Sequence, residues 1–248
     1  MTSFKIYFIF SSEYKFFLKN NNLNFGYTLK RRASIKDILE SFGIPHPEIG
    51  KIFCFQQEVD FFYIPKPRDV FKVYYHTLPL DISQKSILRP RRFLELKFIC
   101  DVNVGKLATL LRMAGEDVLY NPIWDDFKIA QLAWQEQRVV LTKDRGLLKR
   151  KLVEWGYLLR SSSPDLQLKE VKRVFGLKGT NIFKRCLCCN AVLEPIEKTK
   201  ILDKLEPKTK KYYNEFFICP ECGKIYWRGS HFEYMRKRLL KNGFKLAR

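Results

Sequence analysis

The sequence predicts a chain of mixed class, with an α+β part, an α/β part and a cysteine-rich C-terminal part. In residues 1–76, strand-like runs surround a single helical pattern, whereas strands and helices alternate through residues 98–180. Residues 181–248 hold five of the seven cysteines in the chain. A hydrophobic content of 46% is enough to build packed cores in a chain of 248 residues.

The first 76 residues have the pattern of a small β-grasp sheet that wraps one helix. Ser34 is placed as the helix N-cap, with Asp37 in the first turn, and Gly43 is placed just past the helix end. Five strands are predicted: 4–10, 25–29, 51–55, 58–63 and 70–75. With the helix from residue 35, the order is ββαβββ.

Residues 77–97 are predicted to form a linker, because their apolar residues follow no clear period. The segment contains a basic group made of Arg89, Arg91 and Arg92. These arginines could contact phosphates, or they could belong to an exposed connector. The sequence favours neither interpretation.

Residues 98–180 carry aspartates where strand-like runs end. Asp101 follows the run 98–100, Asp144 follows the run 138–142, and Asp125 and Asp126 open a helical pattern. The carboxyl ends of parallel strands form one edge of a sheet, so carboxylates placed there would meet and repel one another unless Mg²⁺ or Mn²⁺ is bound. Each Asp taken alone fits a turn or a helix N-cap equally well.

The rest of this part is predicted to continue the alternation of strands and helices. Helices are expected over 126–137, over 147–155 with Gly156 closing it, and after Ser163 with Pro164 in the first turn. A fourth strand is expected at 157–160. The pattern predicts a mainly parallel sheet.

Basic residues surround the acidic positions in the sequence. They are Lys106, Arg112, Lys143, Arg145, Lys149, Arg150 and Arg160. A basic rim around an acidic centre suits a metal-dependent nuclease, although each single charge is equally typical of a protein surface. The net charge of +20 indicates a polyanionic partner such as nucleic acid, or simply a lysine-rich proteome.

Two C-x₂-C pairs predict a structural zinc site. The expected ligands are Cys186, Cys189, Cys219 and Cys222. Four thiolates with this spacing form a closed tetrahedral zinc ribbon, and Cys188 is expected to be a bystander. Asn190 and Gly223 follow the pairs where a left-handed turn is needed. The lysine-rich residues 198–211 are predicted to be a loop, followed by ribbon strands at 216–218 and 224–227, and Ser230 with Glu233 is expected to cap the last helix.

Segments typical of membrane or secreted proteins are not predicted. No apolar run approaches about 20 residues, the length needed to cross a bilayer. The first residues do not have the pattern of a secretory signal. We therefore expect a cytoplasmic protein with no membrane partner.

The motifs of residues 98–248 resemble the Mut-seven carboxy-terminal RNase family, a branch of the PIN-like metal-dependent nucleases with an appended zinc ribbon. The resemblance is carried by 101–108, 111–115, 141–148, the two cysteine pairs and 226–231. The first 76 residues resemble the ubiquitin-like β-grasp domain often found ahead of this nuclease. The resemblance covers nearly the whole chain.

This resemblance implies cleavage of RNA, with Asp101, Asp126 and Asp144 as ligands of catalytic Mg²⁺ or Mn²⁺. Asp125 stays open as the alternative to Asp126, which is preferred because it starts the helix. Substrate phosphates would be held by Lys106, Arg112, Lys143, Arg145 and Arg160. Asn103 departs from the family pattern, in which a His is expected.

The β-grasp part also departs from its family, because it lacks a C-terminal Gly-Gly and so cannot be a conjugating carrier. It is expected to dock a protein partner or to stabilise the nuclease. Two other functions remain open: a non-enzymatic RNA-binding or ribosome-associated protein, and a DNA-directed repair nuclease.

Overall fold

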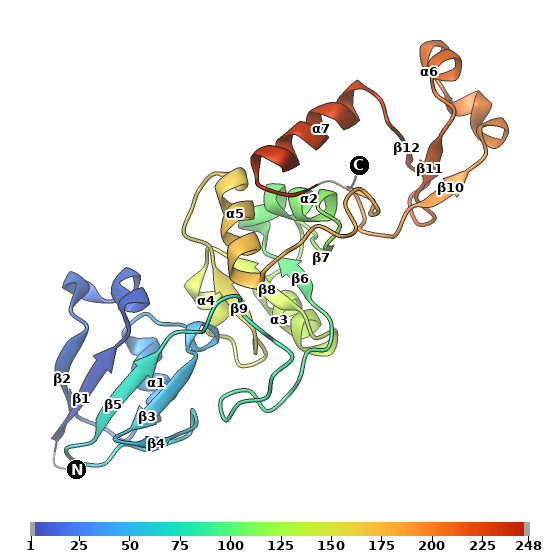
Figure 1. The fold of residues 1–248 in the computed structure, drawn as a ribbon. Helices are drawn as coiled ribbons and strands as arrows, with labels where there is room; N and C mark the ends of the chain where they lie inside the picture. The colour runs from blue at the N-terminus through green and yellow to red at the C-terminus, as the bar shows by residue number, and fades with distance from the viewer. Residues whose placement is uncertain (1–2, 246–248) are drawn as a thin grey trace. The chain divides into compact units, whose positions relative to one another are not determined.

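The computed structural model describes residues 3–245 of the chain (Figure 1). The chain divides into two compact units, each described by itself. One contains Met1–Leu96 and Trp124–Leu159, and the other contains Lys97–Ile123 and Arg160–Arg248. The predicted mixed architecture is confirmed: a ubiquitin-like sheet, parallel strand pairs and a C-terminal cysteine cluster are all present.

A five-stranded sheet forms the N-terminal part of the first unit, in the order β2-β1-β5-β3-β4. Its central strands β1 and β5 are parallel, and the other neighbours are antiparallel. The strands are β1 (Phe4–Phe10), β2 (Asn24–Leu29), β3 (Lys51–Cys54), β4 (Gln57–Glu58) and β5 (Val70–Tyr74). With α1 between β2 and β3, the order of elements along the chain is the predicted ββαβββ of a β-grasp sheet.

Helix α1 (Ile35–Ser41) packs on one face of this sheet. Ser34 and Asp37 form a reciprocal capping box at its start, and Gly43 follows its end with φ of +88°. The ring of Phe42 meets those of Phe8 and Phe25 edge-on, at centroid distances of 5.2 and 5.3 Å. An aromatic core thus holds the helix to the sheet.

The strand predicted at 58–63 is wrong beyond its first residue. Strand β4 ends at Glu58, and the chain then turns. The carboxylate of Asp60 accepts a hydrogen bond from the backbone N–H of Phe62 at 2.9 Å, which is an Asx turn. The apolar residues here indicated a strand, but Asp60 supplies the turn instead.

The same unit contains α3 (Asp126–Gln135), β8 (Val139–Thr142), α4 (Arg145–Leu148) and β9 (Gly156–Leu158). Strands β8 and β9 are parallel, as predicted. The helix expected over 147–155 is wrong, because α4 ends at Leu148. Gly156 does not close a helix but begins β9, where an added Cβ would lie 2.5 Å from the Leu148 side chain.

Both interpretations of Arg89 are wrong, because its side chain is buried. Its guanidinium donates to four backbone carbonyls at 2.8 to 3.2 Å and lies 4.4 Å from the centre of the Trp155 ring. The carbonyls belong to His46, Pro47, Ile49 and Glu154. Three of them come from the β-grasp segment and one comes from the loop before β9. Arg89 therefore joins these two parts of the first unit.

The second unit pairs β6 (Lys97–Cys100) with β7 (Asp117–Leu119), and the pair is parallel as predicted. A short 3₁₀ turn, η4 (Val102–Val104), leads into α2 (Gly105–Met113). Helix α5 (Pro164–Phe175) packs against α2, and the rings of Phe98 and Phe175 lie 5.2 Å apart. Pro164 occupies the first turn of α5 as predicted.

The C-terminal ribbon is a three-stranded antiparallel sheet made of β10 (Glu194–Ile196), β11 (Phe216–Ile218) and β12 (Ile225–Trp227). The loop expected at 198–211 is wrong, since η5 (Lys198–Lys204) and α6 (Pro207–Tyr212) form there. Ile201 of η5 and Leu205, which directly follows η5, pack with Phe216 in a small core. The many lysines of this segment suggested a loop and concealed the spacing of its apolar residues.

Helix α7 (Ser230–Lys241) follows β12. Its N-cap is Gly229, without a side-chain cap, so the capping box expected from Ser230 and Glu233 does not form. Among residues 3–245, no helix is both long and apolar enough to cross a bilayer.

Candidate metal centre and nuclease residues

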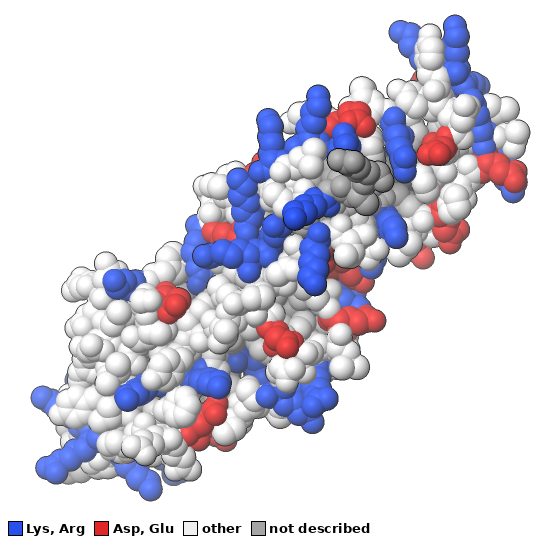
Figure 2. All heavy atoms as spheres, in the orientation of Figure 1, with Lys and Arg blue, Asp and Glu red and all other residues white. Residues whose placement is uncertain are grey.

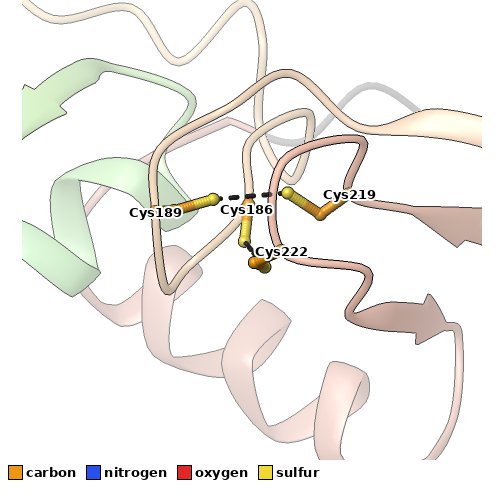
Figure 3. A group of neighbouring side chains, drawn as sticks. All are labelled: Cys186, Cys189, Cys219 and Cys222. Atoms are coloured by element: carbon orange, nitrogen blue, oxygen red, sulfur yellow. Dashed lines mark hydrogen bonds between the residues drawn. The ribbon is translucent and has the colours of Figure 1, made fainter.

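Four cysteines from two loops meet in the second unit. Figure 3 shows the side chains of Cys186, Cys189, Cys219 and Cys222 with their sulfurs turned toward a common point. All four Sγ atoms lie within 4.8 Å of one another, and the closest pairs are 3.3 and 3.6 Å apart. Among the described residues, this is the one group of three or more potential ligands so gathered.

The cluster fits a zinc ion. With Zn–S bonds of about 2.3 Å, tetrahedral ligands lie about 3.8 Å apart, a spacing that lies between the two short S–S distances and the 4.8 Å limit of the group. Backbone geometry supports the arrangement, because Asn190 and Gly223 adopt the predicted left-handed conformation with φ of +79° and +69°. Four protein thiols leave no open position for a substrate, which is typical of a structural site.

Tyr226 from β12 helps to hold the first loop. The backbone N–H of Leu187 donates to its hydroxyl oxygen at 3.1 Å, and the hydroxyl forms a hydrogen bond with Cys186 Sγ, also at 3.1 Å. When Cys186 is a thiolate, the hydroxyl is the donor. Burial raises the pKa of the Cys186 thiol, but this hydrogen bond and the backbone N–H groups of Cys188 and Cys189 outweigh burial and lower the pKa to about 6. A thiolate is the form that binds a metal. Spacing alone gave no signal for this role of Tyr226.

The first cysteine loop is anchored to β7 by Asn190. Its side chain accepts from the backbone N–H of Val118 and donates to the Asp117 carboxylate, both at 2.9 Å. Arg185 adds an ion pair with Asp117 at 3.5 Å. The cysteine loop is therefore built onto the β6–β7 pair.

Arg112 is a second anchor of this loop, and this corrects its predicted role as a phosphate contact. It is only 3% exposed, and its guanidinium donates to the carbonyls of Val118, Leu187 and Cys188 at 2.7 to 3.2 Å. A guanidinium that is buried and donates to three carbonyls is not accessible to a substrate phosphate. The apolar face of α2 predicted burial for its neighbours but gave no sign that the arginine would join them.

Three of the aspartates lie in the first unit. Asp125 is the N-cap of α3 and accepts from the N–H of Lys128 at 2.7 Å. Asp126 is the first residue of α3, half-buried, with Arg150 at 3.5 Å from its Oδ2. Asp144 is the N-cap of α4, and its Oδ1 accepts from the N–H of Gly146 at 2.6 Å. The capping role weighed in the sequence is thus real for Asp125 and Asp144.

Asp101 lies in the second unit, directly after β6 and before η4. It is 3% exposed, and its Oδ2 accepts a hydrogen bond from the side chain of Asn103 at 2.8 Å. The amide that replaces the expected His therefore orients this carboxylate. Its position directly after a strand is the one predicted, whereas nothing in the sequence indicated that its side chain would be buried.

The remaining basic positions differ in exposure. Lys106 in α2 and Lys143 between β8 and α4 are exposed, and Arg160 is half-buried. Arg145 lies over the rings of Phe16 and Phe17, with centroid distances of 5.6 and 5.4 Å. Figure 2 shows lysine and arginine side chains spread over the visible face with carboxylates scattered among them.

Comparison with family models gives two matches that follow one another along the chain. A model described as the Mut7-C RNAse domain matches residues 96–239, more than half of the chain. The chain belongs to the Mut7-C RNAse domain family. A second model, described as Mut7-C ubiquitin, matches residues 3–81. The searches of curated proteins and of solved structures each found no match.

These matches confirm the family and the order of its two modules predicted from the motifs. The nuclease model spans the parallel strand pairs and the cysteine cluster, and the ubiquitin-like model spans the five-stranded sheet. The description of the nuclease domain indicates an RNase, and therefore RNA as the class of substrate.

Proposed function

We propose that this chain is a metal-dependent ribonuclease that hydrolyses phosphodiester bonds, with Asp101, Asp126 and Asp144 as ligands of Mg²⁺ or Mn²⁺. The match to the Mut7-C RNAse domain carries the proposal. Further support comes from the position of each carboxylate, directly after a strand, at a helix start or at a helix N-cap. Asp126 is preferred to Asp125 because it is the first residue of α3, and Asp125 stays the alternative ligand.

The donor set suits hard divalent cations, which prefer carboxylate oxygens. A cation held there would supply an acidified water as nucleophile and positive charge for the leaving oxygen. The chain's own residues orient the groups: Asn103 fixes the Asp101 carboxylate, and the N–H of Gly146 fixes that of Asp144. Lys106, Lys143, Arg145 and Arg160 are the proposed phosphate contacts.

The ubiquitin-like part is proposed to stabilise the nuclease and to hold α4 in place. Arg145 packs on Phe16 and Phe17, and the Nζ of Lys149 donates to the carbonyl of Glu40 at 2.7 Å. Arg145 is the first residue of α4 and Lys149 is its C-cap, so both lie in the helix that Asp144 begins. A contact on this part with a separate protein stays a second proposal, as does the cytoplasmic location.

The test is incubation of the full chain with end-labelled single-stranded RNA and with DNA of the same sequence. Parallel reactions contain Mn²⁺, Mg²⁺, Ca²⁺ or no added divalent ion. The proposal expects cleavage of RNA with Mn²⁺ or Mg²⁺ and none without them. Binding without cleavage under every condition would favour the non-enzymatic RNA-binding alternative, and cleavage of DNA alone would favour a DNA-directed nuclease.

A further inference from the structure

A hollow of about 520 Å³ opens on the second unit between the cysteine ribbon and the start of α7. It is within the range of volumes that bind small molecules or single nucleotides. Five aromatic side chains line it: Tyr212, Tyr213, Tyr226, Trp227 and Phe232. The aspartates of the proposed nuclease site do not line it.

Two of these rings are open to solvent. Tyr212 is 66% exposed and Trp227 is 38% exposed, so both present surface that a ligand could cover. Burying one flat ring against another is favourable, and every nucleobase has a face suited to such stacking. The wall of the hollow is therefore suited to unstacked bases.

The indole of Trp227 is held in place by the turn that follows it. A Cβ added to Gly229 would lie 2.8 Å from Trp227 Nε1 and 3.6 Å from the hydroxyl of Tyr213. Glycine at this position gives the indole room beside the backbone. The ring of Phe216 also lies near it, at a centroid distance of 6.4 Å. The stacking surface is thus preset, which reduces the entropy lost on binding.

The charges around the hollow favour an anion. Lys208, Lys224 and His231 line it, and the described residues that line it include no Asp or Glu. Lys224 reaches the first cysteine loop, where its Nζ donates to Cys188 Sγ at 3.3 Å. Aromatic rings with lysines between them match the bases and phosphates of single-stranded nucleic acid.

The floor of the hollow is coupled to the proposed zinc site. Tyr226 lines the hollow and contacts Cys186 Sγ and the backbone of Leu187 with its hydroxyl. Loss of the metal would therefore loosen both the first cysteine loop and the part of the hollow that Tyr226 forms.

We propose that this hollow binds an unstacked nucleotide of single-stranded RNA, with Trp227 and Tyr212 as stacking residues and Lys208 and Lys224 as phosphate contacts. The proposal rests on the proposed function, because it takes the substrate RNA as its ligand. It adds a binding site, apart from the three aspartates, that positions a segment of the strand on the zinc ribbon.

The test is equilibrium binding of a labelled single-stranded RNA to the full chain without added Mg²⁺ or Mn²⁺, so that cleavage plays no part. Variants Trp227→Ala and Tyr212→Ala are compared with Tyr234→Ala, an exposed aromatic on α7 that does not line the hollow. Removing one base–aromatic stack is expected to weaken binding about five- to 150-fold. Trp227→Phe should retain most of the affinity, and Tyr234→Ala should bind as wild type does.

A second RNA in which abasic sites replace the bases separates stacking from charge. Wild type should bind this RNA more weakly than the complete RNA. The difference should be smaller in Trp227→Ala, which keeps only the Tyr212 stack, and should vanish in the double variant Trp227→Ala/Tyr212→Ala. Zinc content and melting of each variant show that it is folded, and Tyr212, being mostly exposed, can be removed even if the Trp227 variant misfolds. Wild-type affinity in both Tyr212→Ala and Trp227→Ala would overturn the proposal.

The outcomes also separate this inference from the proposed function. Stack-dependent binding by a chain that cleaves nothing would support the hollow and contradict the nuclease. Cleavage with RNA affinity unchanged in the variants would support the nuclease and contradict the hollow. If the variants lost affinity for duplex RNA but not for single-stranded RNA, this would also contradict the proposed hollow, because paired bases cannot enter it.

Discussion

At the scale of single residues, buried polar side chains account for the largest differences between sequence and structure. Arg89 and Arg112 both belong to basic groups that predict contact with phosphate, yet each is buried on backbone carbonyls. A buried guanidinium is stable only with such partners. No period or spacing distinguishes it from an exposed arginine, since the partners come from other segments of the chain.

Replacing Arg89 by Met should lower the free energy of unfolding by about 3–5 kcal/mol, because four buried carbonyls lose their donor. The matched control is Arg92→Met, at an exposed position in the same segment. Urea denaturation of both variants measures the difference. An Arg89 variant as stable as the Arg92 variant would show that the buried contact contributes nothing to stability.

The cysteines allow a matched pair of variants of the same chemistry. Cys186→Ser should bind less zinc and melt at a lower temperature, because a ligand is lost and zinc binding stabilises a fold this small. Cys188→Ser, an exposed cysteine outside the four-sulfur group, should keep both. Metal analysis and thermal melting are the measurements. Equal zinc content in the two variants would contradict the ligand assignment.

At the scale of helices and strands, the sequence correctly predicted features that depend on neighbouring residues, such as helix caps and turns. Caps and turn residues such as Ser34, Gly43 and Asn190 lie where the sequence places them, and β1 has its predicted bounds. Two predictions were wrong because one sequence pattern masked another. The Asx turn at Asp60 ends the strand that the apolar residues predicted, and the many lysines of 198–211 concealed the apolar residues of that segment. For the candidate site, the sequence predicts the four cysteines and the position of each aspartate, but not Tyr226 or the anchors of the cysteine loop.

The end of β5 gives the fold a pH dependence. His76 donates from Nε2 to the carbonyl of Pro47 at 2.8 Å, and burial, with the positive charge of Arg89, lowers its pKa to about 3. Because the unfolded chain takes up this proton near pH 6.5 and the folded chain does not, stability is lost as the pH falls from about 6.5 toward 3. The loss is about 1.4 kcal/mol per pH unit for this one group.

Denaturation of His76→Gln at several pH values between 6.5 and 4 measures this slope. The variant should lose less stability per pH unit than wild type, whereas His231→Gln, at an exposed histidine, should follow wild type. His46, whose pKa burial also lowers, adds to the wild-type slope in the same direction. Identical slopes in wild type and the His76 variant would rule out the contribution of this histidine.

At the scale of the whole molecule, the charge of +20 should dominate the binding of RNA. Each phosphate contact adds about 0.7 to the slope of log affinity against log salt for a single strand. Lys106→Ala should lower that slope by about this amount if Lys106 contacts a phosphate. Titrations between low and physiological salt measure it. A slope near zero in wild type would contradict electrostatic binding.

Three aspartates, and not a protein nucleophile, are proposed to carry RNA hydrolysis. The most direct test of this proposal measures single-turnover cleavage and RNA affinity, at saturating Mn²⁺, for Asp101→Asn and Asp144→Asn beside wild type. Asp125→Asn tests the alternative ligand, and Asp203→Asn, at an exposed position on η5, is the control. Losing a ligand that supports several kcal/mol of charge stabilisation should slow cleavage at least about a hundredfold while affinity and folding persist. Wild-type rates in both the Asp101 and Asp144 variants would contradict the assignment of these aspartates as metal ligands.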